Sequence, residues 1–147
     1  MTQCDLFESF AINLARASDA ATTALTRRLA LYDITAVQWG IVAALHEKEG
    51  VTPTELMAEL ERDLPSTLRL LYKLEKKGIL RRECNPLDRR SQIVYLTPEG
   101  HALWERLSPI VLQLNTEAYG EMDPSCLELM MTTVRSLRAN YGAMLKA

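Results

Sequence analysis

The stretch that decides the fold is Leu64–Gly100, LPSTLRLLYKLEKKGILRRECNPLDRRSQIVYLTPEG. Its first part has a proline near the start, leucines at helical spacing and Gly78 just beyond the end, which predicts a helix over residues 64–76. Residues 79–84 and 91–97 are short and rich in β-branched or aromatic residues, and they flank a turn-rich basic connector over residues 85–90. We therefore expect a helix followed by two strands and an exposed loop.

The helix over residues 64–76 has two chemically different sides. Leu64, Leu68 and Leu71, followed by Leu74 or Glu75, are spaced to lie on one side and are expected to face the core. Ser66, Arg69, Lys73 and Lys76 fall on the other side, which is left free to make contacts.

Three further helices are expected upstream and two downstream. Residues 6–31 contain no proline or glycine and have an amphipathic pattern, and Asp33 and Thr35 offer capping oxygens to a helix that follows them. Thr52–Glu55 combines a capping box with proline at the first helical position. A helix over residues 98–119 and a last helix capped by Asp123 complete the chain. This order predicts a mainly α protein with a small β-hairpin wing, the winged helix-turn-helix.

Charge is distributed unevenly along the chain. The whole sequence has a net charge of -2, but residues 62–90 carry nine basic and four acidic residues, a net charge of +5, while the rest carries -7. A basic face on an acidic body can bind phosphate groups locally. A solvated helix face is the other interpretation of the same charges.

Length and residue types exclude several classes of protein. A chain of 147 residues suits one domain with a dimerisation extension. Cys4, Cys84 and Cys126 are too scattered for a disulfide framework, and His46 and His101 have no metal-ligand spacing, so neither a metal nor a cofactor is expected. No catalytic motif indicates an enzyme. No apolar stretch approaches the roughly 20 residues that cross a membrane, and a cytoplasmic location is expected.

Residues 64–100 resemble the core of the MarR family of bacterial winged helix-turn-helix transcriptional regulators, most specifically in Asp88–Ser91 followed by Leu96–Gly100. The resemblance covers essentially the whole chain, as a single unit over residues 1–147. It implies a DNA-binding region over residues 35–100 and dimerisation helices over residues 1–31 and 101–147. It also implies a homodimer on a pseudo-palindromic operator in double-stranded DNA, often a repressor released by a ligand or by oxidation.

The family pattern assigns DNA contacts to particular residues. It puts Arg90 at the wing tip, in the minor groove, with Asp88 bracing it through an ion pair, and arginine is the side chain that minor grooves favour. Arg81, Arg82 and Arg89 are expected to contact phosphates, and Ser91 belongs to the wing. On the recognition helix we expect base or near-base contacts from Ser66, Thr67 and Arg69, a phosphate contact from Lys73, and a thymine methyl contact or helix initiation from Pro65.

The effector is less well defined by the sequence. Trp39 resembles the aromatic wall of the family's site for phenolic or aromatic carboxylate ligands, with Arg16 and Gln38 nearby, although a core role suits this tryptophan as well. Cys84 adjoins the basic wing, and a thiol-based redox sensor is an alternative. Loss of DNA binding, leaving a winged-helix protein-interaction module, is another.

The last helix carries apolar residues at alternating spacings of three and four, a pattern that favours packing against a partner helix. Together with the apolar face of the first helix, they form the predicted dimer interface: Phe7, Phe10, Leu14, Leu127, Met130, Val134, Leu137, Tyr141 and Met144.

Overall fold

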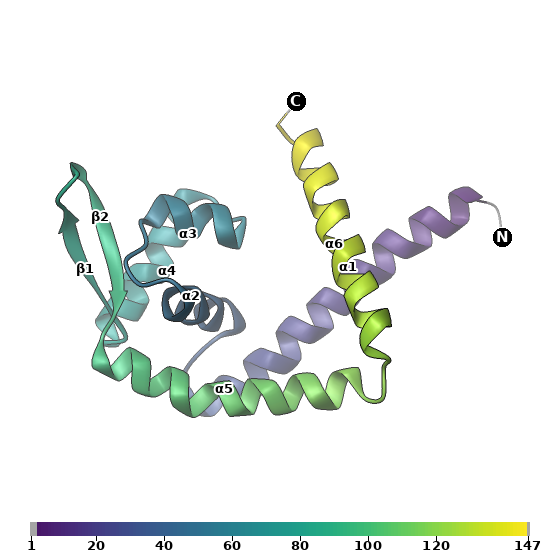
Figure 1. Ribbon diagram of the computed structural model, residues 1–147, viewed down its shortest axis with the longest axis horizontal. Helices are drawn as coiled ribbons and strands as arrows, with labels where there is room; N and C mark the ends of the chain where they lie inside the picture. The colour runs from purple at the N-terminus through teal and green to yellow at the C-terminus, as the bar shows by residue number, and fades with distance from the viewer. Residues whose placement is uncertain (1–2, 147) are drawn as a thin grey trace. The chain divides into compact units, whose positions relative to one another are not determined.

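The computed structural model describes residues 3–146 and the side chains from Ser9 onward (Figure 1). Two predictions, Cys4 and Phe7, concern side chains outside this range. The chain divides into two compact units, Met1–Leu112 and Gln113–Ala147, which are considered separately below.

The first unit begins with α1 (Gln3–Leu29), the short 3-10 helix η1 (Ala30–Tyr32) and α2 (Ala36–Glu47). Thr35 caps α2: its hydroxyl accepts the Gln38 N–H at 3.2 Å, and the Gln38 side chain accepts the Thr35 N–H at 3.1 Å. The prediction that Asp33 also offers a cap was wrong, because Asp33 ends η1 with a φ of 55°.

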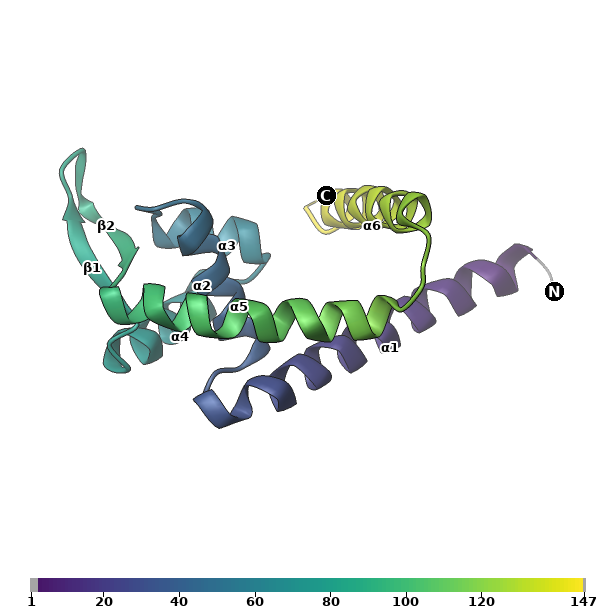
Figure 2. The ribbon, with the colours of Figure 1, turned by 60° about the horizontal axis from the view of Figure 1, so that its bottom comes forward.

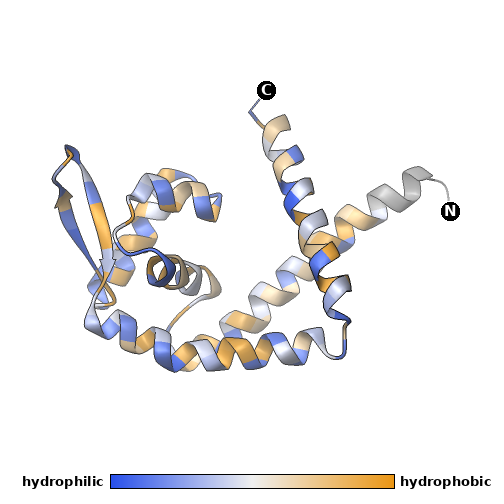
Figure 3. Cartoon of the chain, in the orientation of Figure 1, coloured by the Kyte–Doolittle hydropathy of each residue, from blue (hydrophilic) through white to orange (hydrophobic). Residues whose placement is uncertain are grey.

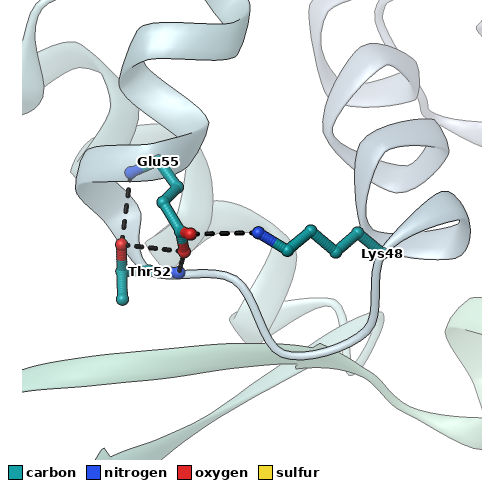
Figure 4. A network of polar contacts seen from close by, with 3 residues as sticks. All are labelled: Lys48, Thr52 and Glu55. Carbon is teal, nitrogen blue, oxygen red and sulfur yellow. Dashed lines mark hydrogen bonds and ion pairs between the residues drawn. The ribbon is translucent and has the colours of Figure 1, made fainter.

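The next two helices are α3 (Pro53–Leu60) and α4 (Leu64–Lys76). A capping box joins Thr52 and Glu55 at the start of α3, as the sequence predicts, and Lys48 pairs with Glu55 at 3.0 Å (Figure 4). The pKa of Glu55 is lowered, chiefly by the Thr52 backbone N–H that its carboxylate accepts. The α4 helix ends where Gly78, with a φ of 73°, turns the chain into the hairpin.

The hairpin consists of β1 (Leu80–Asn85) and β2 (Asp88–Leu96), paired antiparallel with Leu80 opposite Leu96 (Figure 2). Val51, which precedes α3, forms an isolated bridge to Val94 of β2. The hairpin is thus bonded to the helical part at its base while its tip projects.

The core of this unit collects apolar side chains from every element around α4. Leu71 and Leu74 of α4, Ile41 of α2, Leu56 of α3 and Val94 of β2 all have zero exposure. This core fixes α4 against the hairpin. The fold class predicted from the sequence, mainly α with a β-hairpin wing, is confirmed.

The helix α5 (Pro98–Tyr119) starts in very close contact with the base of the hairpin. The Thr97 hydroxyl accepts the Gly100 N–H at 3.1 Å, and the Thr97 N–H donates to the Ile79 carbonyl at 3.0 Å. A Cβ added at Gly100 would lie 2.1 Å from that same carbonyl oxygen. Only glycine therefore fits at this position without movement of the backbone.

The second unit begins at Gln113, inside α5, and contains α6 (Pro124–Met144). Asp123 caps α6 by accepting the Ser125 N–H at 2.8 Å, and Pro124 opens it, as the sequence predicts. Apolar and polar residues alternate along α6 (Figure 3), and none of its described residues is buried.

Among the described residues, no single helix is long and apolar enough to cross a membrane. Taken together, the helices Ser9–Tyr32 and Ala36–Glu47 have the length and apolar composition of a membrane span, but the chain bends by 80° between them. The second of these helices is α2, whose apolar residues pack in the core.

Candidate nucleic-acid interface

The exposed face of α4 begins with a helix cap. Asp63 accepts the Ser66 N–H at 2.8 Å, and this backbone hydrogen bond is the main reason why the pKa of Asp63 is lowered. The cap places Ser66 in the first turn, where its hydroxyl accepts a hydrogen bond from Arg69 Nη2 at 3.1 Å. Ser66, Arg69 and Lys73 line a shallow depression with Arg62. A surface that carries three cations and a hydroxyl can attract an anion.

Three α4 side chains lie elsewhere than predicted. Thr67, expected to contact bases, is fully buried and its hydroxyl donates to the Asp63 carbonyl at 3.0 Å, so that prediction was wrong. Leu64 and Leu68, expected in the core, are each 38% exposed. The buried face of α4 is centred on Thr67 and Leu71 rather than on Leu68, because the helix is rotated relative to the orientation that the leucine spacing predicts.

The connector between the two strands is shorter than the sequence predicts. The connector is the two-residue turn Pro86–Leu87, and residues 88–90 belong to β2 rather than to a loop. The register changes from Asn85 opposite Asp88 to Cys84 opposite Gln92, which leaves residues 89–91 as extra residues on β2. Such a bulge alters where side chains point. Arg89 and Arg90 therefore lie beside the hairpin tip and not at it.

Asp88 does not form the predicted ion pair with the Arg90 guanidinium. Its carboxylate instead accepts the backbone N–H of Arg90 at 2.9 Å, while Asn85 Oδ1 accepts the Leu87 N–H at 3.0 Å. Two short polar side chains thus fix the backbone of the tip and the bulge. The Arg90 side chain is exposed.

Arg81 and Arg82 have structural contacts of their own. Arg82 Nε donates to Glu75 at 2.9 Å, and its side chain is only 22% exposed, so it joins β1 to α4. Arg81 pairs with Glu83 and lies 4.6 Å from the centre of the Tyr95 ring. The geometry contradicts a free phosphate contact for Arg82, because its guanidinium is already paired with a carboxylate of the unit.

A groove separates α4 from the bulge. Its walls are Pro53 and Thr54 at the start of α3, Leu64 and Leu68 of α4, and residues 88–92 of β2. The cap shown in Figure 4 fixes the α3 wall, since Thr52 and Glu55 hold the first turn of α3, which contains Pro53 and Thr54. The unit therefore presents helix, groove and arginine-bearing strand next to one another.

The three predicted effector residues lie in different surroundings. Trp39 is 7% exposed and stacks on Trp104 of α5, with ring centres 4.8 Å apart. His46 also stacks on Trp104, with ring centres 4.2 Å apart. Gln38 is buried and its amide oxygen accepts the Thr35 N–H, which engages it in the cap. Arg16 is exposed on α1. The sequence did not indicate this aromatic stack, because Trp104 is distant in the chain.

Cys84 and Cys126 are exposed free thiols. His101 lies 3.3 Å from Glu49, and within the described residues no group of three or more histidine, cysteine or acidic side chains is arranged to hold a metal.

A capped recognition helix, a short preceding helix and a paired hairpin define a winged helix-turn-helix protein. The model of the MarR family matches residues 34–92 of this chain, and this match confirms the resemblance seen in the sequence.

Its relatives agree. The chain is similar to the transcriptional regulator HosA of Escherichia coli O111:H-, with 29% identity over 107 residues that cover 73% of this chain and 79% of HosA. It is 36% identical to the multiple antibiotic resistance protein MarR of Escherichia coli strain K12 over 89 residues, 60% of this chain and 62% of that protein. The homologues are transcriptional regulators of the MarR family, which are not enzymes.

The fold also matches solved structures. A mutant of MarR from Escherichia coli, crystallised with operator DNA, superposes with a TM-score of 0.82 over 93% of this chain and 99% of that one, at 24% identity. This likeness concerns the fold.

Proposed function

We propose that this chain is a homodimeric, sequence-specific DNA-binding regulator, with α4 in the major groove and the hairpin reaching an adjacent minor groove. The observation that carries the proposal is the pair of basic surfaces in one unit: Arg69 and Lys73 on α4, and Arg89 and Arg90 on the bulge of β2. An α-helix fits the major groove, and a narrow minor groove attracts arginine. The crystallised MarR–operator complex has the same fold, which supports this mode of binding.

Each exposed residue has a distinct role in this proposal. Ser66 and Arg69 contact base edges from the first turns of α4, and Pro65, exposed beside them, approaches a thymine methyl. Lys73 and Arg89 contact phosphates, which position the protein without reading sequence. Arg90 enters the minor groove of the DNA. Ser91, the next residue, lines the protein groove between α4 and β2.

We propose that a second copy of the chain covers the apolar residues of α6. Met130, Val134, Tyr141 and Met144 are 42%, 36%, 54% and 69% exposed, while Leu127 and Leu137 are half-buried. On α1, Phe10 is 47% exposed and Leu14 is half-buried. Large apolar side chains left exposed along a helix are typical of a surface that binds a protein partner. Dimerisation through residues 1–31 and 101–147 would present two DNA-binding regions, residues 35–100, to a pseudo-palindromic operator.

We propose that the protein represses transcription in the bacterial cytoplasm, where it reaches chromosomal DNA, and that a small aromatic ligand releases it from the DNA. The feature that supports an aromatic ligand is the Trp39–Trp104–His46 stack, which links α2 of the DNA-binding region to α5. Trp39 and Trp104 are the two tryptophans of the chain. Their fluorescence therefore reports on this stack directly, and titration with salicylate, a phenolic carboxylate, should quench it and release bound DNA.

The DNA proposal is tested by selecting duplexes from a random-sequence library with the full-length protein, then measuring binding by fluorescence anisotropy. We expect a pseudo-palindromic consensus and preferential binding over a scrambled duplex. Arg69→Ala should abolish that preference, whereas Arg135→Ala, which changes a basic side chain of α6, should not. Failure to enrich any sequence would favour the protein-interaction module instead.

A further inference from the structure

Two half-exposed leucines of α4 are not part of the buried core. Leu64 and Leu68 are one helical turn apart and each is 38% exposed, whereas Thr67, Leu71 and Leu74 bury the core-facing side of the same helix. Leu64 and Leu68 thus lie along the border between the buried and the exposed surface of α4. They contribute an apolar wall to the groove beside the bulge of β2.

Cations flank this apolar wall on two sides. Arg89 and Arg90 line the opposite side of the groove, and Arg69 and Lys73 follow on the outer surface of α4. A purely apolar partner would desolvate these charges without compensation. A nucleic acid duplex supplies phosphates for the cations, and its major groove supplies apolar groups for the leucines, so it satisfies both features.

We propose that Leu64 and Leu68 recognise thymine 5-methyl groups in the major groove, and that they set part of the sequence specificity. This inference rests on the proposed DNA binding. Thymine is the base that presents a methyl group on the floor of this groove, while adenine and cytosine present amino donors and guanine presents acceptors. A leucine cannot pair with those polar groups, and a polar group left unpaired in an interface is costly. The two leucines therefore favour thymine and disfavour the other bases.

The test removes the proposed leucine–methyl contact in two ways, once by changing the DNA and once by changing the protein. In a duplex selected by the wild-type protein, every thymine is replaced in turn by deoxyuridine, which lacks the methyl group, and binding is measured for wild-type, Leu64→Ala and Leu68→Ala proteins. Burial of one methyl group predicts about a fourfold loss of affinity per contact. Leu31→Ala controls for the loss of a leucine outside the DNA-facing surface, because Leu31 lies in η1; light scattering verifies that this variant, whose residue falls in the proposed dimerisation region, is still a dimer.

We expect at least one thymine in each half-site whose replacement weakens wild-type binding about fourfold, and the same replacement should have no effect on one of the leucine variants. The Leu31→Ala protein should respond as the wild type does. Full sensitivity to deoxyuridine in both leucine variants would overturn the inference, as would a wild-type protein indifferent to every replacement. Either result leaves DNA binding intact, whereas failure to select any duplex would refute the proposed function and this inference together. Thermal unfolding of each variant verifies that it is folded.

Discussion

Asp88 provides the sharpest test of how the wing is built. Its carboxylate accepts the Arg90 backbone N–H at 2.9 Å, so Asp88 should act on the shape of the bulge and not on the guanidinium. Asparagine retains an oxygen that can accept this hydrogen bond, while alanine does not. We therefore expect Asp88→Asn and Asp88→Ala to differ in their affinity for a selected duplex.

The magnitudes follow from two terms. Loss of one exposed hydrogen bond costs about 1 kcal/mol, but Asp88→Ala also removes the negative charge, so it should weaken binding only about threefold. Removal of one negative charge about 10 Å from a phosphate is worth about 0.4 kcal/mol in water, so Asp88→Asn should tighten binding about twofold. Arg90→Ala should cost about 2 kcal/mol, as expected for a specific contact.

Anisotropy titrations at fixed salt measure all three, together with the Asp88→Ala, Arg90→Ala double variant. Because Asp88 also shapes the backbone around Arg89 and Ser91, its loss should still weaken binding in the absence of the Arg90 side chain. Equal losses for Asp88→Asn and Asp88→Ala, with no further loss in the double variant, would refute this reasoning and restore the ion pair.

Three further outcomes are expected. Gly100→Ala puts a Cβ 2.1 Å from a backbone carbonyl, so urea unfolding should show a loss of about 2–3 kcal/mol, while Gly40→Ala, whose Cβ would meet only a side chain at 3.5 Å, should be neutral or stabilising; equal stability of the two variants would contradict this. The pKa of Glu55 is lowered by folding, so its contribution to stability is complete above its ordinary value of 4.5 and is lost as the pH falls through the lower folded value; Glu55→Gln should flatten the pH dependence of unfolding below pH 4.5, and unchanged curves would count against the cap. Val134→Glu should convert the dimer to a monomer in light scattering at micromolar concentration, and a persistent dimer would exclude α6 from the interface.

Much of the fold could be predicted from the sequence because its boundaries are local. Thr35, Thr52 and Asp123 each cap the helix that follows them, and Gly78 ends α4 with a positive φ. These signals depend on neighbours within a few residues. The order of elements then leaves few alternatives to a winged helix-turn-helix.

The details of the interface could not be predicted because they depend on packing. Leucine spacing is compatible with several rotations of α4, and only contacts with other elements decide that Thr67 is buried while Leu68 is exposed. Arg82 looks the same in sequence as the exposed Arg89 and Arg90, but the fold brings Glu75 within 2.9 Å of it. Likewise, the bulge that carries Arg89 and Arg90 arises from strand register, which a turn-rich sequence does not specify.

The measurement that tests the central claim most directly is the salt dependence of DNA binding by wild-type, Lys73→Ala and Arg135→Ala proteins on a selected duplex. If α4 contacts phosphates, the logarithm of the affinity falls linearly with the logarithm of salt concentration, and Lys73→Ala reduces the slope by about 0.9. Arg135→Ala, on α6, should leave the slope unchanged. An affinity independent of salt, or equal slopes for wild-type and Lys73→Ala proteins, would contradict the assignment of α4 as the DNA-binding helix.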